Sequence, residues 1–356
     1  MNTISRTQLL GMNCHQLEEY LLQVGQHRYR GRQIYKWIYQ KDVNSFYEMS
    51  DIPKELRQQL DEISVVSIPR VLKQRVSKDG TRKFLMELDD RKRIETVVIP
   101  QGEEREARYS LCISTQVGCP VGCAFCATGT SGYQRSLQSY EMVGQFLSSR
   151  RELKRRLKKN DDSLISNVVY MGMGEPFFNY DQVIASVYLL IDPQGINIGQ
   201  RHITISTSGE VKGIKRLAEE NLQVTLAISL HATNDHLRDQ LVPLNRKYSL
   251  DQLIEAVDYY IKKTNRRVTF EYVMLDDVNI SRVHADQLIK MVKPLLANIN
   301  LIPYNEVEIL PFKKPSSTKV WQFYHWLVEG GLNVTIREER GGDIEAACGQ
   351  LYVKER

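Results

Sequence analysis

The stretch GCPVGCAFCATG, residues 118–129, carries Cys119, Cys123 and Cys126 within eight positions. It comes shortly after YSLCIST, residues 109–115, an apolar stretch with the composition of a β-strand. Loops that follow the strands of a parallel β/α barrel carry its chemistry. Three thiolates on one such loop can bind one soft metal centre. The stretch therefore predicts both a β/α sheet and a metal site at its edge.

The kind of metal centre follows from the number of ligands. A structural zinc site needs a fourth Cys or His, and the nearest histidine downstream is His202. Cysteine thiolates are also the ligands of iron–sulfur clusters, and a cube held by three of them leaves one iron open. We therefore expect a [4Fe-4S] cluster on Cys119, Cys123 and Cys126.

The sequence around this loop alternates between strand-like and helix-like stretches about six times. This alternation is typical of parallel β/α units. The strand-like stretches are residues 109–115, 166–173, 201–208, 224–230, 267–275 and 299–305, and the helix-like stretches are residues 139–157, 181–191, 211–221, 250–263 and 285–298. A further helix at 320–331 and strand at 332–338 follow. The fold class predicted is α/β, a partial (β/α)6 TIM-like barrel.

The N-terminal part has a different pattern. Apolar residues recur at helical spacing in residues 15–25, 30–43 and 52–63. A hairpin turn at Lys78-Asp79-Gly80 and the strand-like stretch 93–100 come next. We expect a small helical domain over 1–65, a β-hairpin and linker segment over 66–107, and a catalytic domain over 108–356.

Composition and charge exclude some classes of protein. Hydrophobic residues make up 42% of the chain and charged residues 26%, and the net charge is +5. No apolar run approaches the roughly 20 residues of a membrane helix, and the N-terminus lacks the pattern of a signal peptide. We expect a cytoplasmic protein without membrane contact, whose six cysteines serve metal binding or catalysis rather than disulfides.

The segment CPVGCAFC, residues 119–126, resembles the CxxxCxxC signature of the radical S-adenosylmethionine (SAM) superfamily, including the aromatic residue before the last cysteine. The resemblance implies that SAM binds the open iron through its amino and carboxylate groups. Gly174-Glu175 in MGMGEP is similar to the superfamily motif that holds the SAM amino group. The further cofactor-binding candidates lie at later strand ends: Ser206, Ser229, Leu230, His231 and Asn305.

Two isolated thiols narrow the resemblance. Cys348 lies in RGGDIEAACGQL, residues 340–351, and Cys112 lies just before the cysteine loop. With CATG, MGMGEP and SLHATND, they closely resemble the RlmN/Cfr family of radical-SAM RNA methyltransferases over essentially the whole chain. The resemblance implies that residues 1–65 are a small RNA-binding accessory domain. By itself, Cys112 reads equally as a small buried residue of a strand.

The resemblance also implies a mechanism that uses two SAM molecules per turnover. Cys348 takes a methyl group from the first, and the second, cleaved at the cluster, yields a radical that removes a hydrogen from that methyl. The carbon then adds to an adenine ring, and Cys112 frees the product by attacking the Cys348 sulfur. Glu95, in RIETVVIP, lies where the family has its proposed base.

The expected substrates are carbon 2 of an adenine in 23S rRNA, at the peptidyl-transferase centre, and of the tRNA adenine next to the anticodon. An electron donor such as flavodoxin is implied. Three alternatives stay open: a Cfr-type enzyme acting on carbon 8, which MGMGEP and STSG disfavour, a radical-SAM enzyme modifying a protein or peptide, and a non-catalytic RNA-binding module. The basic stretches 28–41 and 150–159 read either as RNA contacts or as solvated helix faces.

Overall fold

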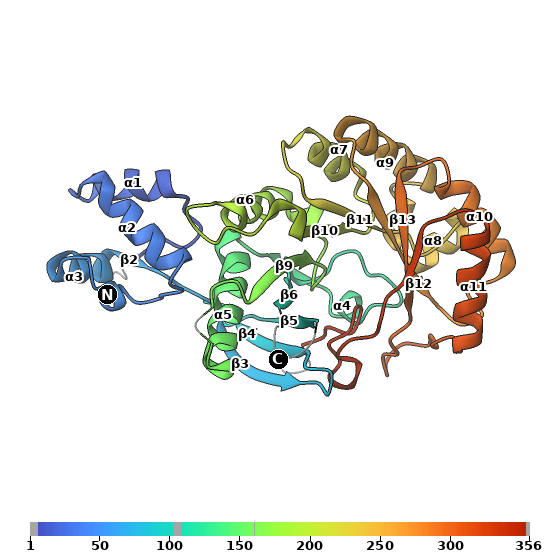
Figure 1. Ribbon diagram of the computed structural model, residues 1–356, viewed down its shortest axis with the longest axis horizontal. Helices are drawn as coiled ribbons and strands as arrows, with labels where there is room; N and C mark the ends of the chain where they lie inside the picture. Colours follow the sequence, from blue (N-terminus) through green and yellow to red (C-terminus); the bar gives the residue numbers. More distant parts are fainter. Residues whose placement is uncertain (1–5, 103–107, 160, 354–356) are drawn as a thin grey trace.

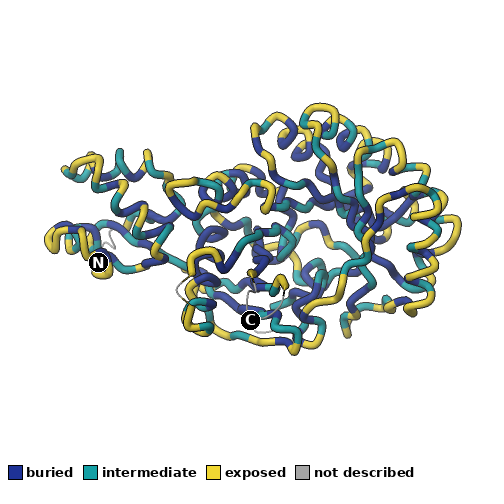
Figure 2. Tube along the Cα trace, viewed as in Figure 1, coloured by how far each residue is buried: buried dark blue, intermediate teal, exposed yellow. Residues whose placement is uncertain are grey.

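The computed structural model describes residues 6–102, 108–159 and 161–353. A small helical part forms one end of an elongated molecule, and a large sheet with helices on its outer side forms the rest (Figure 1). Buried residues follow the strands and the inner sides of the helices, while exposed residues follow the outer turns (Figure 2). The fold is the α/β class that the sequence predicts.

The N-terminal part contains α1 (Cys14–Gln23), α2 (Arg28–Tyr39) and α3 (Lys54–Ile63), and two short parallel strands, β1 (Thr7–Gln8) and β2 (Ser64–Val65). Asn13 begins α1 with a capping box to Gln16, which satisfies backbone donors that have no partner within the helix. The helices predicted here are confirmed.

The main sheet has ten strands among the described residues. Its order is β14-β13-β12-β11-β10-β9-β6-β5-β4-β3. The strands are β3 (Arg70–Val76), β4 (Arg82–Glu87), β5 (Arg93–Gln101), β6 (Arg108–Cys112), β9 (Ile165–Tyr170), β10 (Ile203–Thr207), β11 (Thr225–Ser229), β12 (Val268–Met274), β13 (Ala297–Pro303) and β14 (Val334–Ile336). Those from β6 to β14 are parallel, and β3 to β6 pair antiparallel. The sheet is a barrel left open between β14 and β3.

Helices connect the parallel strands and cover the outer side of the sheet (Figure 1). They are α5 (Ser139–Leu157), α6 (Tyr180–Ile191), α7 (Val211–Glu219), α9 (Leu250–Thr264), α10 (Arg282–Val292) and α11 (Ser317–Glu329). These six helices follow six successive parallel strands, in agreement with a partial (β/α)6 barrel.

The predicted hairpin is present, and several further short elements were not predicted. The turn at Gly80, which has a positive φ of 82°, joins β3 to β4 as expected, and β5 then continues this hairpin into the barrel strand β6. The cysteine loop, however, is flanked by a small hairpin of β7 (Gln116–Gly118) and β8 (Tyr133–Ser136) and contains α4 (Ala127–Thr130). A further helix, α8 (Asp235–Leu241), follows β11. All are too short to show a periodic pattern.

The basic stretch 150–159 helps to join the two parts of the chain. Arg150 is 1% exposed, and its Nε donates to Asp42 Oδ1 at 2.8 Å and its Nη2 to the carbonyl of Tyr39 at 2.7 Å. Lys154 pairs with the other oxygen of Asp42 at 2.8 Å. These two basic side chains therefore hold α5 against the end of α2 instead of facing solvent.

Candidate active site

The C-terminal segment lies on the cysteine loop. The backbone N–H of Ala127 donates to the carbonyl of Gly349 at 2.7 Å, and Thr128 Oγ1 donates to the carbonyl of Leu351 at 2.7 Å. Both donors belong to α4, directly after Cys126. Cys348 is thereby brought beside the three cysteines predicted to hold a cluster, and all four line one cavity.

The three loop cysteines are half-buried, and protein atoms replace much of the water around their thiols. Burial raises the pKa of the Cys119 thiol to about 12, and it raises the pKa values of Cys123 and Cys126 as well. The negative charges of the neighbouring thiolates raise each value further. Such thiols are poor nucleophiles when free, so a cationic centre is needed to hold them as thiolates.

The donor set of this cavity suits an iron–sulfur cluster. Cys119, Cys123 and Cys126 line the same cavity, and cysteine thiolates are the ligands of such clusters. Among the described residues, no group of three or more His, Cys, Asp or Glu side chains is placed to hold a metal ion. Each of the three cysteines would bind one iron of the cluster.

Gly174 and Glu175 line the same cavity as the three cysteines. Gly174 has φ +106°, and a Cβ there would lie 2.6 Å from Thr115 Oγ1, so only glycine fits. Glu175 is buried, and its carboxylate accepts hydrogen bonds from Thr207 Oγ1 and from both the backbone N–H and Oγ of Ser208, each at 2.7 Å. These donors fix the carboxylate at the cavity and offset part of its desolvation.

The strand-end candidates divide into two groups. Ser206, Ser229, His231 and Asn305 line the cavity with the cysteines. Leu230 is fully buried and is absent from the cavity wall. Its backbone N–H donates to the carbonyl of Glu271 at 3.0 Å, so it contributes to the sheet edge rather than to the surface of the site.

His231 is a neutral imidazole. It has φ +60°, and its Nδ1 accepts the backbone N–H of Val273 at 3.0 Å. Burial and then the charge of Arg238 lower its pKa to about 3. Its ring packs edge-on against Phe125, the aromatic residue of the cysteine motif, with centroids 4.8 Å apart. This histidine supports the cysteine loop and contributes no charge to the site.

Arg238 is a residue of the site that no sequence pattern indicated. This side chain is fully buried, and it donates to the carbonyls of Ser208 at 2.7 Å, Ser229 at 3.1 Å and Leu230 at 3.0 Å. It therefore holds the ends of β10 and β11 at a fixed separation. Its positive charge also lies near Cys123.

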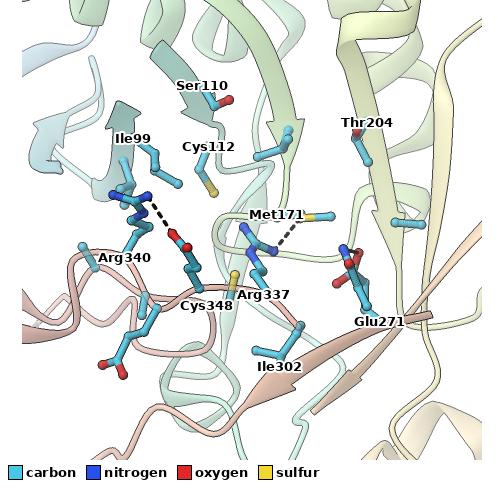
Figure 3. A pocket seen from close by; sticks show the side chains of 18 of the residues that line it. Ile99, Ser110, Cys112, Met171, Thr204, Glu271, Ile302, Arg337, Arg340 and Cys348 are labelled. Atoms are coloured by element: carbon cyan, nitrogen blue, oxygen red, sulfur yellow. Dashed lines mark hydrogen bonds and ion pairs between the residues drawn. The ribbon is translucent and has the colours of Figure 1, made fainter. Parts of the chain in front are cut away.

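Cys112 and Cys348 share a second, larger cavity of about 500 Å³ inside the barrel (Figure 3). Both thiols are free. Burial, and then the charge of Cys348, raise the pKa of Cys112 to about 12, whereas the nearby guanidinium of Arg337 lowers it. The structure thus brings together the two isolated thiols, as the two-thiol mechanism requires.

Glu95 lies in a separate, smaller cavity behind the C-terminal segment. Its carboxylate is 3.1 Å from Lys83 Nζ, and it accepts the backbone N–H of Tyr352 at 2.9 Å. Burial raises its pKa, and Lys83 opposes that shift. The structure does not bring Glu95 to the cavity that holds Cys112 and Cys348.

The residues of the basic and aromatic stretch 28–41 have two kinds of surroundings: some are buried or paired within the helices, and others are exposed. Tyr35 and Tyr39 are buried in the core, and Arg28 and Arg32 pair with acidic residues of α1. Tyr29 is exposed and carries the Arg30 guanidinium 4.7 Å from its ring centroid. The aromatic residues of this stretch therefore serve mainly the packing of the helices.

Comparisons with known proteins agree with this geometry. Residues 113–288 match the model of the Radical SAM superfamily, and residues 7–66 match the Ribosomal RNA large subunit methyltransferase N-terminal domain. A Probable dual-specificity RNA methyltransferase RlmN of Syntrophomonas wolfei subsp. wolfei is 65% identical over 99% of this chain and 98% of its own. The chain belongs to the RlmN family of radical SAM RNA methyltransferases.

Two other relatives cover the chain equally well. The Dual-specificity RNA methyltransferase RlmN of Alcanivorax borkumensis is 42% identical over 100% of this chain and 93% of its own. The crystal structure of a radical SAM methyltransferase from Sphaerobacter thermophilus is 42% identical, covers 97% of this chain and 99% of its own, and has a TM-score of 0.91. As a member of the RlmN family, the enzyme uses a [4Fe-4S] cluster and SAM.

None of the helices in residues 6–102, 108–159 and 161–353 has the length and apolar content to cross a membrane.

Proposed function

We propose that this enzyme methylates carbon 2 of adenine in 23S rRNA, at the peptidyl-transferase centre, and in tRNA, at the adenine next to the anticodon. The observation that carries the proposal is that Cys348 lines both cavities, the one with the three loop cysteines and the one with Cys112. A carbon carried on this sulfur can therefore face both the cofactor and the second thiol.

Two thiols have successive roles in this proposal. Cys348, as the thiolate, attacks the methyl carbon of SAM and becomes S-methylated. When bound, the cluster and SAM supply the one-electron chemistry that removes a hydrogen atom from this unactivated methyl group. The carbon on Cys348 then bonds to carbon 2 of the ring, which links the RNA to the protein. Carbon 2 gives up its hydrogen as a proton to a base, and the one electron in excess would return to the cluster.

Cys112 then ends the reaction. Its thiolate attacks the sulfur of Cys348, so that an S–S bond forms as the C–S bond breaks. The electron pair stays on the released carbon, which takes up a proton and becomes the product's methyl group. A thiol outside the protein reduces the disulfide. We keep Glu95 as the proposed base on the family resemblance, and the raised pKa of its buried carboxyl suits proton uptake.

The cofactor contacts follow from the smaller cavity. Cys119, Cys123 and Cys126 would hold the cluster, and Glu175 would accept the ammonium of SAM beside the close backbone approach that Gly174 allows. The strand ends would contact the rest of SAM through Ser206, Ser229, the backbone of Leu230 and His231, and Asn305. The buried, unpartnered Oδ1 of Asn305 supports this assignment because it faces the cavity without a donor.

The partners are proposed with the function. The accessory domain would bind RNA, with the exposed Tyr29 and Arg30 as the contacts that packing leaves available. A small electron carrier such as flavodoxin would reduce the cluster, and the reaction would take place in the cytoplasm. Methylation at carbon 2 is favoured over carbon 8 because the relatives named above are RlmN proteins.

The test is anaerobic incubation of the reconstituted enzyme with methyl-labelled SAM, a reductant, and rRNA or tRNA from a strain that lacks the modification. Nuclease digestion and mass spectrometry should give 2-methyladenosine from both RNAs. Cys348→Ala should give none, whereas Cys14→Ala, whose thiol lies outside both cavities, should behave as wild type. Label found only in 8-methyladenosine, or only in protein, would refute the proposal.

A further inference from the structure

Three buried polar atoms on the cavity walls lack a partner. Within the described parts of the chain, Glu271 Oε2, Tyr304 Oη and Asn305 Oδ1 are buried without a hydrogen bond. Glu271 Oε2 is the one carboxylate oxygen among them. Glu271 is 5% exposed, and its other oxygen accepts from Asn300 Nδ2 at 3.2 Å. A buried carboxylate oxygen without a donor is costly, so it indicates a ligand that donates there.

Glu271 belongs to a row of side chains along one wall. Figure 3 shows the guanidinium of Arg337 between Glu271 on one side and Cys348 on the other. The charges of the same groups act on one another: the charges of Cys348, Glu271 and Cys112 raise the pKa of Arg337, and the charge of Arg337 opposes the rise in the pKa of Glu271 that burial causes. Arg337 Nη1 contacts the sulfur of Met171 at 3.8 Å, a weak acceptor that leaves the guanidinium free to donate elsewhere.

The row presents an acceptor, a donor and a reactive sulfur, in that order. The Watson–Crick edge of adenine presents the matching series: the exocyclic amino group as donor, N1 as acceptor, and then carbon 2. We propose that Glu271 and Arg337 read this edge, Glu271 accepting from the amino group and Arg337 donating to N1, so that carbon 2 faces Cys348. The inference rests on the proposed function and specifies how the same site selects its base.

This arrangement explains two kinds of selectivity. Guanine presents a carbonyl to Glu271 and an N–H to Arg337, so that both contacts become repulsive, and its carbon 2 already carries an amino group. Carbon 8 of adenine lies on the far side of the purine, so a base held by this edge turns carbon 8 away from Cys348. A hydrogen bond from a guanidinium to N1 also draws electron density from carbon 2, which favours addition there.

The experiment compares two RNA hairpins that differ only at the target base, adenosine or purine riboside, which lacks the amino group. Wild-type enzyme should prefer adenosine by about 10- to 100-fold in kcat/KM, the size expected for one hydrogen bond to a charged group. In Glu271→Leu this preference should fall to about threefold or less. Glu210→Gln, which changes a buried carboxylate outside both cavities, should keep the full preference.

A binding measurement covers the case in which Glu271→Leu does not fold. Without reductant, fluorescence anisotropy with wild-type protein should show the adenosine hairpin binding more tightly than the purine riboside hairpin. Equal binding and equal turnover of the two hairpins by wild type, or an unchanged preference in Glu271→Leu, would overturn the inference. Failure of the proposed function is a different result: wild type would then form no 2-methyladenosine from the adenosine hairpin.

Discussion

The release step should be limited by deprotonation of Cys112. The attacking species is the thiolate, and this thiol lies in the barrel interior with 7% exposure. Desolvation raises the pKa of this thiol well above its ordinary value, in spite of the opposing charge of Arg337. In the adduct Cys348 is a thioether, so its charge no longer adds to that shift. Because the pKa of Cys112 is well above neutrality, only a very small fraction of this thiol is a thiolate at pH 7.

The magnitude of the pH effect follows from that fraction. Well below the pKa, the thiolate fraction rises tenfold with each pH unit, so the decay of the protein–RNA adduct should accelerate about 100-fold between pH 7 and pH 9. In Cys112→Ala the adduct should persist at every pH, because no thiol is available to attack Cys348.

The assay is a single-turnover reaction that is quenched at intervals and separated on a denaturing gel. The adduct is a protein band of reduced mobility that nuclease treatment removes. Cys14→Ala, which changes a half-buried thiol in the N-terminal helices, should reproduce the wild-type decay and its pH slope. A decay that does not change with pH, or normal turnover by Cys112→Ala, would refute the reasoning.

Two further substitutions test the framework of the site. Gly174→Ala should abolish SAM binding measured by isothermal titration, because the new Cβ would lie 2.6 Å from Thr115 Oγ1, next to Glu175. Gly25→Ala is the control: Gly25 also has a positive φ, +79°, but a Cβ there would have no atom within 4 Å, so SAM binding should not change. Arg238→Met should lower the free energy of unfolding by about 3 kcal/mol or more in a denaturant titration, because three strand-end carbonyls lose their buried donor. A decrease of less than about 1 kcal/mol would show that Arg238 is not needed to stabilise the strand ends.

Local patterns in the sequence were enough for the framework. The alternation of apolar stretches reflects side chains that contact their own strand or helix neighbours, so the parallel strands and their covering helices could be predicted. The cysteine motif and Gly174-Glu175 are also contiguous: the spacing of the three thiols predicts a metal site, and Gly174-Glu175 was assigned by its resemblance to a superfamily motif. The short elements α8, β7 and β8 were not predicted, because three to seven residues are too few to show a periodic pattern.

The pairing of distant thiols was inferred from a family resemblance, and only the folded chain supplies its physical basis. Two hydrogen bonds from α4 hold the C-terminal segment, and no local feature of residues 340–351 states where that segment lies. The position of Glu95 also depends on the folded chain. The pattern of its strand does not show on which side of the C-terminal segment the Glu95 carboxylate lies.

What the sequence by itself determined is therefore the set of elements and the contiguous motifs, because both are written in neighbouring residues. The tertiary structure decided which distant side chains share a cavity. Glu271 and Arg337 lie in strand-like stretches for which the sequence predicted no function, and their order beside Cys348 depends on the curvature of the sheet. Curvature arises from the twist accumulated over all the strands, and no single stretch of sequence contains it.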